Sequence, residues 1–194
     1  MIIGITGSIG SGKTTIAKLF SRYHFNRIDA DEIAHKIIDN KEIKNKIIKS
    51  FGKGILNKKN KINRKGLGDI VFNDKSKLSK LNSIMLPSII NKIKNLVKRI
   101  KNNYGADAKI VIDAPLLLET KAKNLVDKII VVKAYKKNII KRLNKKYPEE
   151  KIEKILKVQI PLGKKLGYAD FVIDNNKDLK HLENQVKEFI KKLK

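Results

Sequence analysis

The chain has 194 residues, no cysteine and no tryptophan, and its 45 Lys and Arg against 19 Asp and Glu give a formal net charge of +26. This length suits one domain with room for an inserted lobe, and the lack of cysteine excludes a disulfide framework and a Cys/His zinc site. No apolar run approaches the ~18 residues of a membrane span, and the short apolar start does not resemble a signal peptide. We therefore expect a cytoplasmic protein with no membrane association.

The positive charge could indicate a nucleic-acid-binding protein, because Lys and Arg neutralise phosphates. The cations are mostly Lys, however, and they are scattered over nearly every predicted helix. Asn and Ile, which share adenine- and thymine-rich codons with Lys, are also abundant, so drift in base composition explains all three. The few Tyr and Phe form no stacking platform. We expect neither a specific nucleic-acid partner nor an obligate protein partner, and we keep a basic nucleotide-dependent nucleic-acid-binding protein as the less favoured alternative.

The first predicted element is a strand over residues 2–6, a nearly continuous apolar run typical of a strand buried on both faces. It leads through GSIGSGKT, residues 7–14, into a helical pattern over 14–23. This is the full G-x-x-x-x-G-K-[ST] motif, set between a strand and a helix. Its glycines let successive N–H groups converge on phosphate oxygens, and the helix adds the positive end of its dipole. We predict a phosphate loop in preference to a glycine-rich turn without a ligand.

The motif also assigns roles to single residues. Lys13 is predicted to reach the β- and γ-phosphates of ATP, and the Thr14 hydroxyl to hold Mg²⁺. No correctly spaced guanine-reading motif N-K-x-D is present, and the chain is short for a motor ATPase or helicase, so a small-molecule kinase fits best. The predicted nucleotide-binding residues of the loop are Ser8, Ile9, Gly10, Ser11, Gly12, Lys13, Thr14 and Thr15.

The next element, NRID at 26–29, predicts a short strand that ends beside two carboxylates, Asp29 and Asp31. Phosphoryl transfer to an alcohol needs a carboxylate that orients the hydroxyl and accepts its proton, and Asp31 is our candidate for this base. Asp is also a favoured N-cap residue, so capping of the following helix explains Asp29 or Asp31 at least as well from these residues alone.

From about residue 32 to 104 the chain shows no convincing core strand. Its apolar residues recur at helical spacing, which predicts an inserted lobe of helices. Such a lobe would form one wall of a cleft over the carboxyl edge of the sheet, where open α/β sheets bind ligands. The periodic positions are Ile43, Ile47, Ile48, Ile89, Ile90, Ile93, Leu96, Val97 and Ile100.

The remaining chain alternates again between strands and helices. Apolar runs predict strands at 109–113, 128–133 and 170–174. Helical patterns occupy 137–145, 150–158 and 178–193. This alternation predicts an α/β fold with a parallel sheet. We expect a single domain over 1–194, with a core of about 1–31 and 105–194 and the helical substrate lobe at about 32–104.

Several short motifs between residues 3 and 176 occur in the order and approximate spacing of the dephospho-CoA kinases, and the chain resembles this family. They are GITGSIGSGKT, IDADEIA, FGKGIL, INRKGL, VFND, LNSIMLP, IDAPLLLE, KRL, ILKVQ and ADFVIDNN. The phosphate loop is shared by many families, whereas D-A-D, P-L-L-x-E and A-D-F-V-I-D-N together are specific.

This resemblance implies a three-layer P-loop kinase fold with a mobile lid at about 143–168. It also implies the reaction: ATP, with Mg²⁺, phosphorylates the 3′-hydroxyl of the ribose of dephospho-CoA and gives CoA, in the last step of coenzyme A synthesis. The alternative within enzymes is another small-molecule P-loop kinase, of the nucleoside or shikimate type.

The resemblance implies further residue roles. Asp31 matches the second Asp of D-A-D, the general base, and Asp29 would help to hold the acceptor ribose or the metal shell. Arg142, in KRL, matches the arginine that contacts the ATP phosphates at the start of the lid, and Asn175 lies where the adenine should rest. Arg64, in INRKGL, is implied to hold the substrate.

Four other positions take roles from the match. Glu119 is assigned to the substrate, while Gln159 and Lys165 match positions on the far side of the lid. Asp113 either serves Mg²⁺ in the manner of a Walker B carboxylate or caps the turn before Pro115.

Three residues depart from the pattern of the family. Ser8 stands where a second glycine is usual, and the further glycines should still let the turn form. Leu86 replaces the usual His before the proline of L-N-x-x-x-H-P, so a polar contact at this substrate-binding position is lost or supplied by a neighbour. Lys146 replaces an Arg of the lid, which keeps the charge and loses the bidentate geometry.

Overall fold

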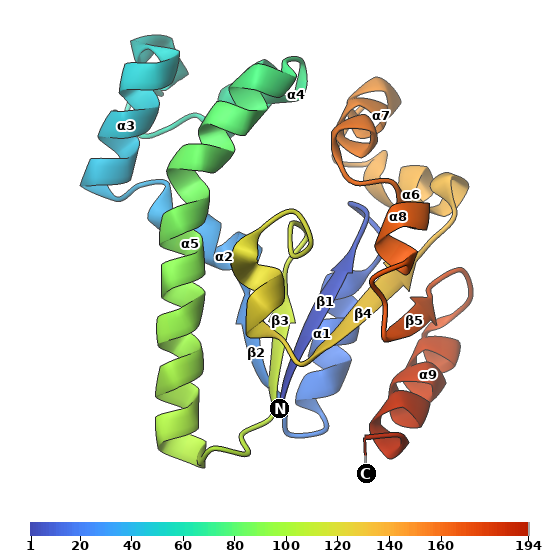
Figure 1. The fold of residues 1–194 in the computed structure, drawn as a ribbon. Helices are drawn as coiled ribbons and strands as arrows, with labels where there is room; N and C mark the ends of the chain where they lie inside the picture. Colours follow the sequence, from blue (N-terminus) through green and yellow to red (C-terminus); the bar gives the residue numbers. More distant parts are fainter. Residues whose placement is uncertain (194) are drawn as a thin grey trace.

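The computed structural model describes residues 1–193, and its centre is one sheet of five parallel strands. The strands are β1 (Ile2–Gly7), β2 (Asn26–Asp29), β3 (Ile110–Asp113), β4 (Lys128–Lys133) and β5 (Phe171–Asp174), in the spatial order β2-β3-β1-β4-β5 (Figure 1). Every residue of β1 and β3 is buried, as expected for strands covered on both faces. The predicted α/β fold with a parallel sheet is confirmed, and each predicted strand lies within one residue of its expected bounds.

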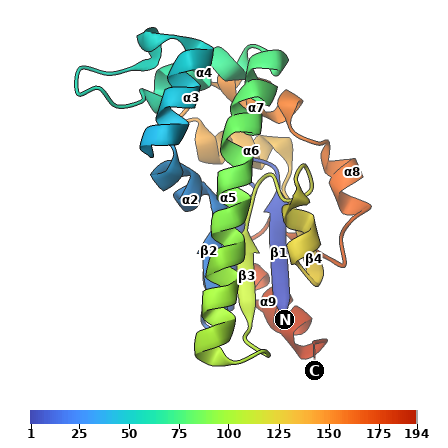
Figure 2. The same cartoon turned by 60° about the vertical axis from the view of Figure 1, so that its left-hand side comes forward.

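Helices cover both faces of the sheet, so the molecule has three layers (Figures 1 and 2). On one face α1 (Lys13–Ser21) and α9 (Leu179–Lys191) pack together through Phe20 and Phe189, whose ring centroids lie 5.9 Å apart. The other face is covered by α2 (Ala30–Ile37), α5 (Lys75–Tyr104) and the short 3₁₀ helix η2 (Lys121–Leu125). The side chains of β3 alternate between the two layers, as the pleat of a strand requires.

The helical lobe predicted between β2 and β3 is present. Besides α2 and α5 it contains α3 (Lys41–Phe51), the 3₁₀ helix η1 (Lys53–Ile55) and α4 (Arg64–Phe72). Side chains cap these helices: Asn40 begins α3, Asn63 begins α4 and Asp74 begins α5, each accepting a hydrogen bond from an N–H of the first turn. In Figures 1 and 2, α3 and α4 stand beyond the carboxyl end of the sheet, beside the first part of α5.

Within this lobe α5 is longer than its sequence suggests, because it runs for 30 residues through Pro87. Proline in a helix interior removes one backbone hydrogen bond and bends the axis. Figure 1 shows the part of α5 next to α4 inclined to the rest of the helix. Burial of Met85, Ile89 and Ile93 in the hydrophobic core that joins the lobe to this face of the sheet keeps the helix continuous across the proline.

Three helices follow β4 in the segment predicted to include the lid: α6 (Lys136–Leu143), α7 (Glu149–Val158) and α8 (Leu162–Leu166). The first two match the predicted helical patterns, whereas α8 is a short helix that the sequence analysis missed. They lie beyond the carboxyl ends of β4 and β5, across from α4 (Figure 1). Within residues 1–193, no helix combines the length and the apolar character that a membrane span requires.

Candidate active site

The phosphate loop joins β1 to α1 at the centre of the sheet, and its backbone requires glycine. Gly10 has φ 70° and Gly12 has φ 96°, in the left-handed region that side chains with a Cβ rarely adopt. A Cβ on Gly12 would also lie 2.0 Å from Nδ2 of Asn175. No side chain among the described residues caps α1, which begins at Lys13 after Gly12 as its N-cap. Its first amides and its positive dipole end can therefore serve an anion.

Lys13 lies inside this loop. Its Nζ donates hydrogen bonds to the carbonyl oxygens of Gly7 at 3.2 Å and Ser8 at 2.9 Å, and the residue is 7% exposed. Burial lowers the pKa of Lys13, and the charges of Asp113 and Asp31 oppose this shift. Lys13 is thus held within the loop by its own carbonyl groups, and its predicted contact with the β- and γ-phosphates stays a prediction.

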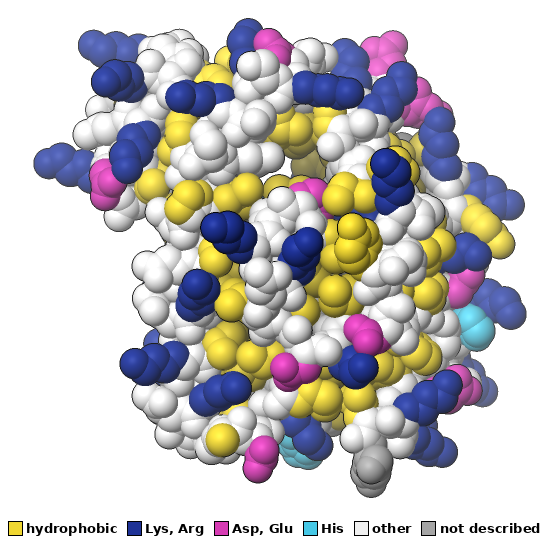
Figure 3. Space-filling model, viewed as in Figure 1, with side chains coloured by type: hydrophobic (Ala, Val, Ile, Leu, Met, Phe, Trp, Pro, Cys, Tyr) yellow, Lys and Arg dark blue, Asp and Glu magenta, His cyan; other side chains and the backbone are white. Residues whose placement is uncertain are grey.

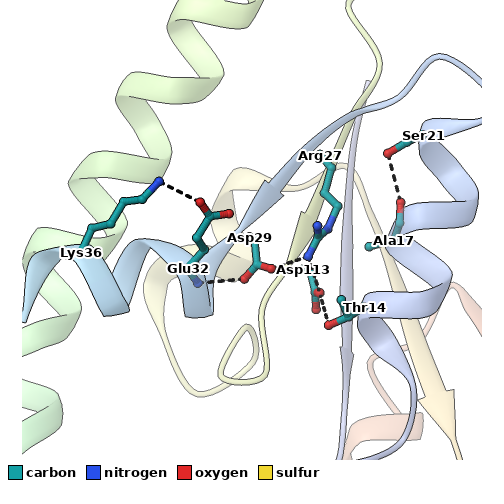
Figure 4. A network of polar contacts seen from close by, with 8 residues as sticks. All are labelled: Thr14, Ala17, Ser21, Arg27, Asp29, Glu32, Lys36 and Asp113. Atoms are coloured by element: carbon teal, nitrogen blue, oxygen red, sulfur yellow. Dashed lines mark hydrogen bonds and ion pairs between the residues drawn. The ribbon is translucent and has the colours of Figure 1, made fainter. Parts of the chain in front are cut away.

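Three carboxylates, Asp29, Asp31 and Asp113, lie near one another where β2 and β3 end. Figure 4 shows the contacts of two of them, Asp29 and Asp113. Asp29 is the N-cap of α2: its Oδ1 accepts a hydrogen bond from the N–H of Glu32 at 3.0 Å, while its Oδ2 accepts one from Arg27. Capping is therefore the work of Asp29, which leaves the carboxylate of Asp31 in the first turn of α2. Of the two possibilities that the residues left open, the structure favours a cap at Asp29 and not at Asp31.

Asp31 has the electrostatic setting of a proton acceptor. Its side chain is accessible to solvent, yet the protein around it keeps enough water away to raise its pKa above the usual value. Lys13 opposes this shift, while the negative charges of Asp29 and Asp113 add to it. A carboxylate with a raised pKa is a stronger base than an ordinary Asp.

Asp113 and Thr14 form the polar pair expected beside a nucleotide-bound metal ion. The Thr14 hydroxyl donates a hydrogen bond to Oδ2 of Asp113 at 2.8 Å, and Asp113 is 3% exposed. Burial raises the pKa of Asp113, and the Thr14 hydrogen bond opposes it. Hydroxyl and carboxylate oxygens are hard donors that suit Mg²⁺, which keeps most of its shell for water and phosphate oxygens. The residues present therefore fit a Mg²⁺ ion, and Thr14 and Asp113 are the side chains that would hold it.

The sequence analysis missed Arg27, which sits between these carboxylates. Its Nη2 bonds to Asp29 and lies 3.6 Å from Oδ2 of Asp113. Arg27 and Asp29 are two residues apart on β2, so their side chains project from the same face of the sheet. The available signal was the occurrence of a charged pair within a strand of only four residues, NRID.

On the other side of the loop, Arg142 and Asn175 hold its backbone. Arg142 donates to the carbonyl of Gly10 at 3.4 Å and to that of Asn175 at 2.7 Å. Nδ2 of Asn175 donates to the carbonyl of Ser11 at 2.6 Å. The structure thus brings these two predicted nucleotide-binding residues to the loop. It also gives Asn175, 6% exposed, a task beyond the predicted place beside the adenine.

A second group joins the far end of the predicted lid to the loop after β3. Oε1 of Gln159 accepts a hydrogen bond from the N–H of Ile9 at 3.0 Å. Lys165 is 0% exposed, and its Nζ lies 3.1 Å from Oε1 of Glu119 and 3.2 Å from the carbonyl of Pro115. Lys165 and Ile160, the residue after Gln159, therefore both contact Glu119 in the loop after β3, while Gln159 itself contacts the phosphate loop.

Three buried polar side-chain atoms lack a hydrogen-bond partner among residues 1–193: Ser11 Oγ, Arg27 Nε and Glu119 Oε2. Buried polar atoms are normally paired, so each such atom asks for an explanation. All three belong to residues of the groups just described. Their concentration at the carboxyl end of the sheet is the pattern of a polar site that a bound ligand completes.

The remaining predicted site residues lie farther out. Arg64 belongs to the helical lobe, where it donates to the carbonyl of His35 and pairs with Asp39 at 3.2 Å. Leu86 is half-buried on α5, next to Pro87. Lys146, one of the departures from the family pattern, places its Nζ over the ring of Tyr147, 5.3 Å from the centroid. Nothing in these contacts tests the substrate roles of Arg64 and Leu86, which remain predictions.

The lobe and the lid region face each other across a hollow. Figure 3 shows the surface recessed between the ends of α4 and α5 on one side and α7 on the other. An ion pair between Lys151 of α7 and Asp69 of α4 bridges the two sides. Within residues 1–193, no group of three or more His, Cys, Asp or Glu side chains is placed to hold a metal ion.

A parallel sheet of order 2-3-1-4-5, a phosphate loop after β1, and carboxylates at the ends of β2 and β3 together define a P-loop kinase. Its nucleotide site and its acceptor site share the carboxyl edge of the sheet. The comparisons with known proteins narrow this class. The profile of the dephospho-CoA kinase family matches residues 1–181, and the chain belongs to this family.

Individual relatives support the same family assignment. A dephospho-CoA kinase of Fusobacterium nucleatum subsp. nucleatum is 40% identical, over 97% of this chain and 96% of the relative. The solved dephospho-CoA kinase of Campylobacter jejuni has a TM-score of 0.69 at 31% identity, covering 99% of this chain and 96% of that one. A crystal structure from Thermus thermophilus has a TM-score of 0.80 at 25% identity, covering 100% and 98%. These matches do not favour a nucleoside kinase, a shikimate kinase or a nucleic-acid-binding protein.

Proposed function

We propose that the chain transfers the γ-phosphoryl group of ATP to the 3′-hydroxyl of the ribose of dephospho-CoA, with Asp31 as the general base. The observation that carries this proposal is the position of Asp31. Asp29 caps α2, so the carboxylate of Asp31 is not engaged as the helix cap. The pKa of Asp31 is raised, and the charge of Lys13 acts on it. The name of the family supplies the acceptor, and the arrangement of charges supports transfer to an alcohol.

In this proposal each group has one task. Asp31 accepts the proton of the 3′-hydroxyl, whose oxygen attacks the γ-phosphorus while the bond to the bridging oxygen of ADP breaks. Lys13 and Arg142 stabilise the negative charge on the phosphoryl oxygens. Mg²⁺, held through Thr14 and Asp113, would neutralise phosphate charge when bound. The loop residues from Ser8 to Thr15, with Asn175, hold the nucleotide.

The acceptor lies on the other side of the cleft. Asp29, Arg64, Leu86 and Glu119 are its proposed contacts, and residues 143–168 act as a lid that keeps water from taking the phosphoryl group. The partial exposure of Arg64, whose side chain is 45% accessible, and the unpaired buried Oε2 of Glu119 support this placement, since each retains capacity for a polar contact. We place the reaction in the cytoplasm, where ATP is supplied.

The test is ATP turnover by the purified protein with and without dephospho-CoA, with products identified by mass. ADP and CoA should form together, and Asp31→Asn should slow their formation by about 10²-fold or more, the usual contribution of a general base. Asp107→Asn, in the exposed loop after α5, makes the same charge change away from the site and should leave the rate unchanged. A full rate in Asp31→Asn would refute the role of Asp31, and ATP consumption without CoA would refute the acceptor.

The pH dependence gives a second measurement on the same variant. Asp31 must be ionised to accept a proton, so kcat/KM should rise with pH through its pKa. Burial raises that pKa, so the acidic limb should lie at a higher pH than for an ordinary Asp. The residual activity of Asp31→Asn should lack this limb, and a limb unchanged in the variant would assign it to another group.

A further inference from the structure

Two residues, one directly before the proposed lid and one within it, are hydrogen-bonded to the tip of the phosphate loop. Directly before the lid, Nη1 of Arg142 donates to the carbonyl of Gly10 at 3.4 Å. Within the lid, after α7, Oε1 of Gln159 accepts from the N–H of Ile9 at 3.0 Å. Ile9 and Gly10 are neighbours in the loop, while Arg142 and Gln159 enclose the segment that contains α7. A movement of α7 therefore acts on the two peptide groups that flank the Ile9–Gly10 peptide, one through the Ile9 N–H and one through the Gly10 carbonyl.

Gln159 lies between α7 and the anchored segment of residues 160–165. The chain directly after it is fixed to the loop that follows β3, because the N–H of Ile160 donates to Oε1 of Glu119 at 3.4 Å and the buried Lys165 contacts the same oxygen. Withdrawing Lys165 would leave a buried carboxylate or ammonium without its partner, which makes this anchor costly to break. Residues 160–165 of the lid region are thus fixed to the loop after β3, so the part of the lid left to move lies before Gln159 and contains α7.

On the other side of the boundary, α7 is held more weakly. Its polar contacts are the ion pairs Lys136–Glu153 with α6 and Lys151–Asp69 with α4, and in each pair at least one side chain is more than half exposed. Exposed ion pairs of this kind contribute little to stability and break readily. Ile152 and Ile155 supply the buried contacts of α7. The polar links of α7 to α6 and α4 are therefore weaker than the anchor at residues 160–165.

We propose that Gln159 is a positioning residue that couples closure of the lid to the phosphate loop, so that the phosphoryl group passes to the bound acceptor and not to water. Its carboxamide ties the hinge of α7 to the Ile9 amide, and the loop conformation that holds ATP is then the one in which α7 covers the cleft. Water attack in an incompletely closed site would give ADP and inorganic phosphate without CoA. This inference rests on the proposed function.

The measurement is the ratio of inorganic phosphate to CoA formed from ATP and dephospho-CoA. In Gln159→Met, which keeps the length of the side chain and removes the acceptor oxygen, this ratio should rise about 3- to 10-fold, the effect expected from one neutral hydrogen bond. Gln159→Asn is too short to reach Ile9 and should behave in the same way. Gln159→Glu keeps an acceptor oxygen and should retain the wild-type ratio, although its charge weakens ATP binding.

Gln185→Met is the matched control. Oε1 of Gln185 in α9 accepts from the N–H of Asp174 at 2.8 Å, so this variant also loses a contact between a glutamine and a backbone amide. It should lower the melting temperature and leave the ratio unchanged. A wild-type ratio in Gln159→Met and Gln159→Asn, or an equal rise in Gln185→Met, would overturn the inference. No CoA from the wild-type protein would instead overturn the proposed function.

Discussion

At the scale of single residues, Arg27 supplies the positive charge that allows three acidic side chains to lie close together. Asp29, Asp31 and Asp113 would repel one another at the end of the sheet, and Asp113 is almost fully buried. The guanidinium of Arg27 is shared between Asp29 and Asp113, and its side chain is only 22% exposed. Arginine suits this position because its planar group offers several donors in fixed directions.

Replacing Arg27 should therefore cost stability. Arg27→Met removes the counter-charge of two mostly buried carboxylates, and we expect the free energy of unfolding to fall by about 2 kcal/mol. Arg22→Met makes the same charge change at the exposed pair with Glu183, where both side chains are well solvated, and should cost under about 1 kcal/mol. Urea unfolding at neutral pH measures both. Equal losses would mean that Arg27 contributes no more than a surface cation.

At the scale of secondary structure elements, α5 connects the helical lobe to the sheet. Its second half packs on the sheet and its first half carries α4, so the bend near Pro87 sets the angle between the two. The residues that contact the phosphate loop belong to the core and to the lid region, whereas Arg64 and Leu86 belong to the lobe. A change in the bend should therefore affect the acceptor more than ATP.

Pro87→Ala should stabilise the fold and weaken acceptor binding. Alanine restores a helix hydrogen bond, and we expect the free energy of unfolding to rise by about 1 kcal/mol or more. The straighter helix should raise KM for dephospho-CoA while the Kd of ATP stays unchanged.

Pro148→Ala is the control, because Pro148 directly precedes α7 and lies outside its interior. Its replacement gives the unfolded chain more conformational freedom and should cost a small amount of stability. Thermal unfolding and steady-state kinetics report these effects. A stability loss in Pro87→Ala would show that the core is packed around the bend.

At the scale of the whole molecule, the charge is the dominant property. The net charge is +26, and Figure 3 shows Lys and Arg spread around the visible face with no gathering at one place. The ion pairs join neighbouring elements at scattered points of the surface, for example α1 with α9 and α6 with α7. A compact molecule with this excess of one sign repels itself more strongly than the expanded unfolded chain.

Salt should therefore stabilise this protein. Raising NaCl from about 20 mM to about 200 mM shortens the screening length from about 20 Å to about 7 Å, and we expect the melting temperature to rise by at least about 2 °C, which corresponds to about 1 kcal/mol for a domain of this size. Differential scanning calorimetry in a non-binding buffer measures it. A matched series in sucrose separates screening from general solvent effects, and a falling melting temperature in NaCl would mean that the surface ion pairs outweigh the net repulsion.

The elements that depend on neighbouring residues were predictable from the sequence. The apolar runs located all five strands within a residue, and the spacing of Gly7, Gly12, Lys13 and Thr14 located the phosphate loop. Helical periodicity predicted the lobe between β2 and β3. Each of these features is encoded by side chains a few positions apart, so local backbone preference and hydrophobic patterning are sufficient to specify it.

Residues that act across the fold were harder to predict. Periodicity did not reveal that α5 continues through Pro87, because burial of its flanking residues overrides the local preference against proline. The choice between Asp29 and Asp31 as the helix cap also depended on three-dimensional geometry. Arg27 resembled one more cation in a basic chain until β2 and β3 were placed side by side.

By itself, the sequence determined the fold class, the nucleotide-binding loop and the family resemblance, since these reside in short motifs and periodic patterns. Only the tertiary structure decided the strand order, the burial of Lys165 against Glu119 and the hydrogen bond from Ile9 to Gln159, 150 positions along the chain. The physical reason is that such contacts are stabilised by burial and charge pairing between segments that meet after the chain has folded. No local pattern specifies which of the many lysines, which glutamate or which of the two glutamines will meet a given partner.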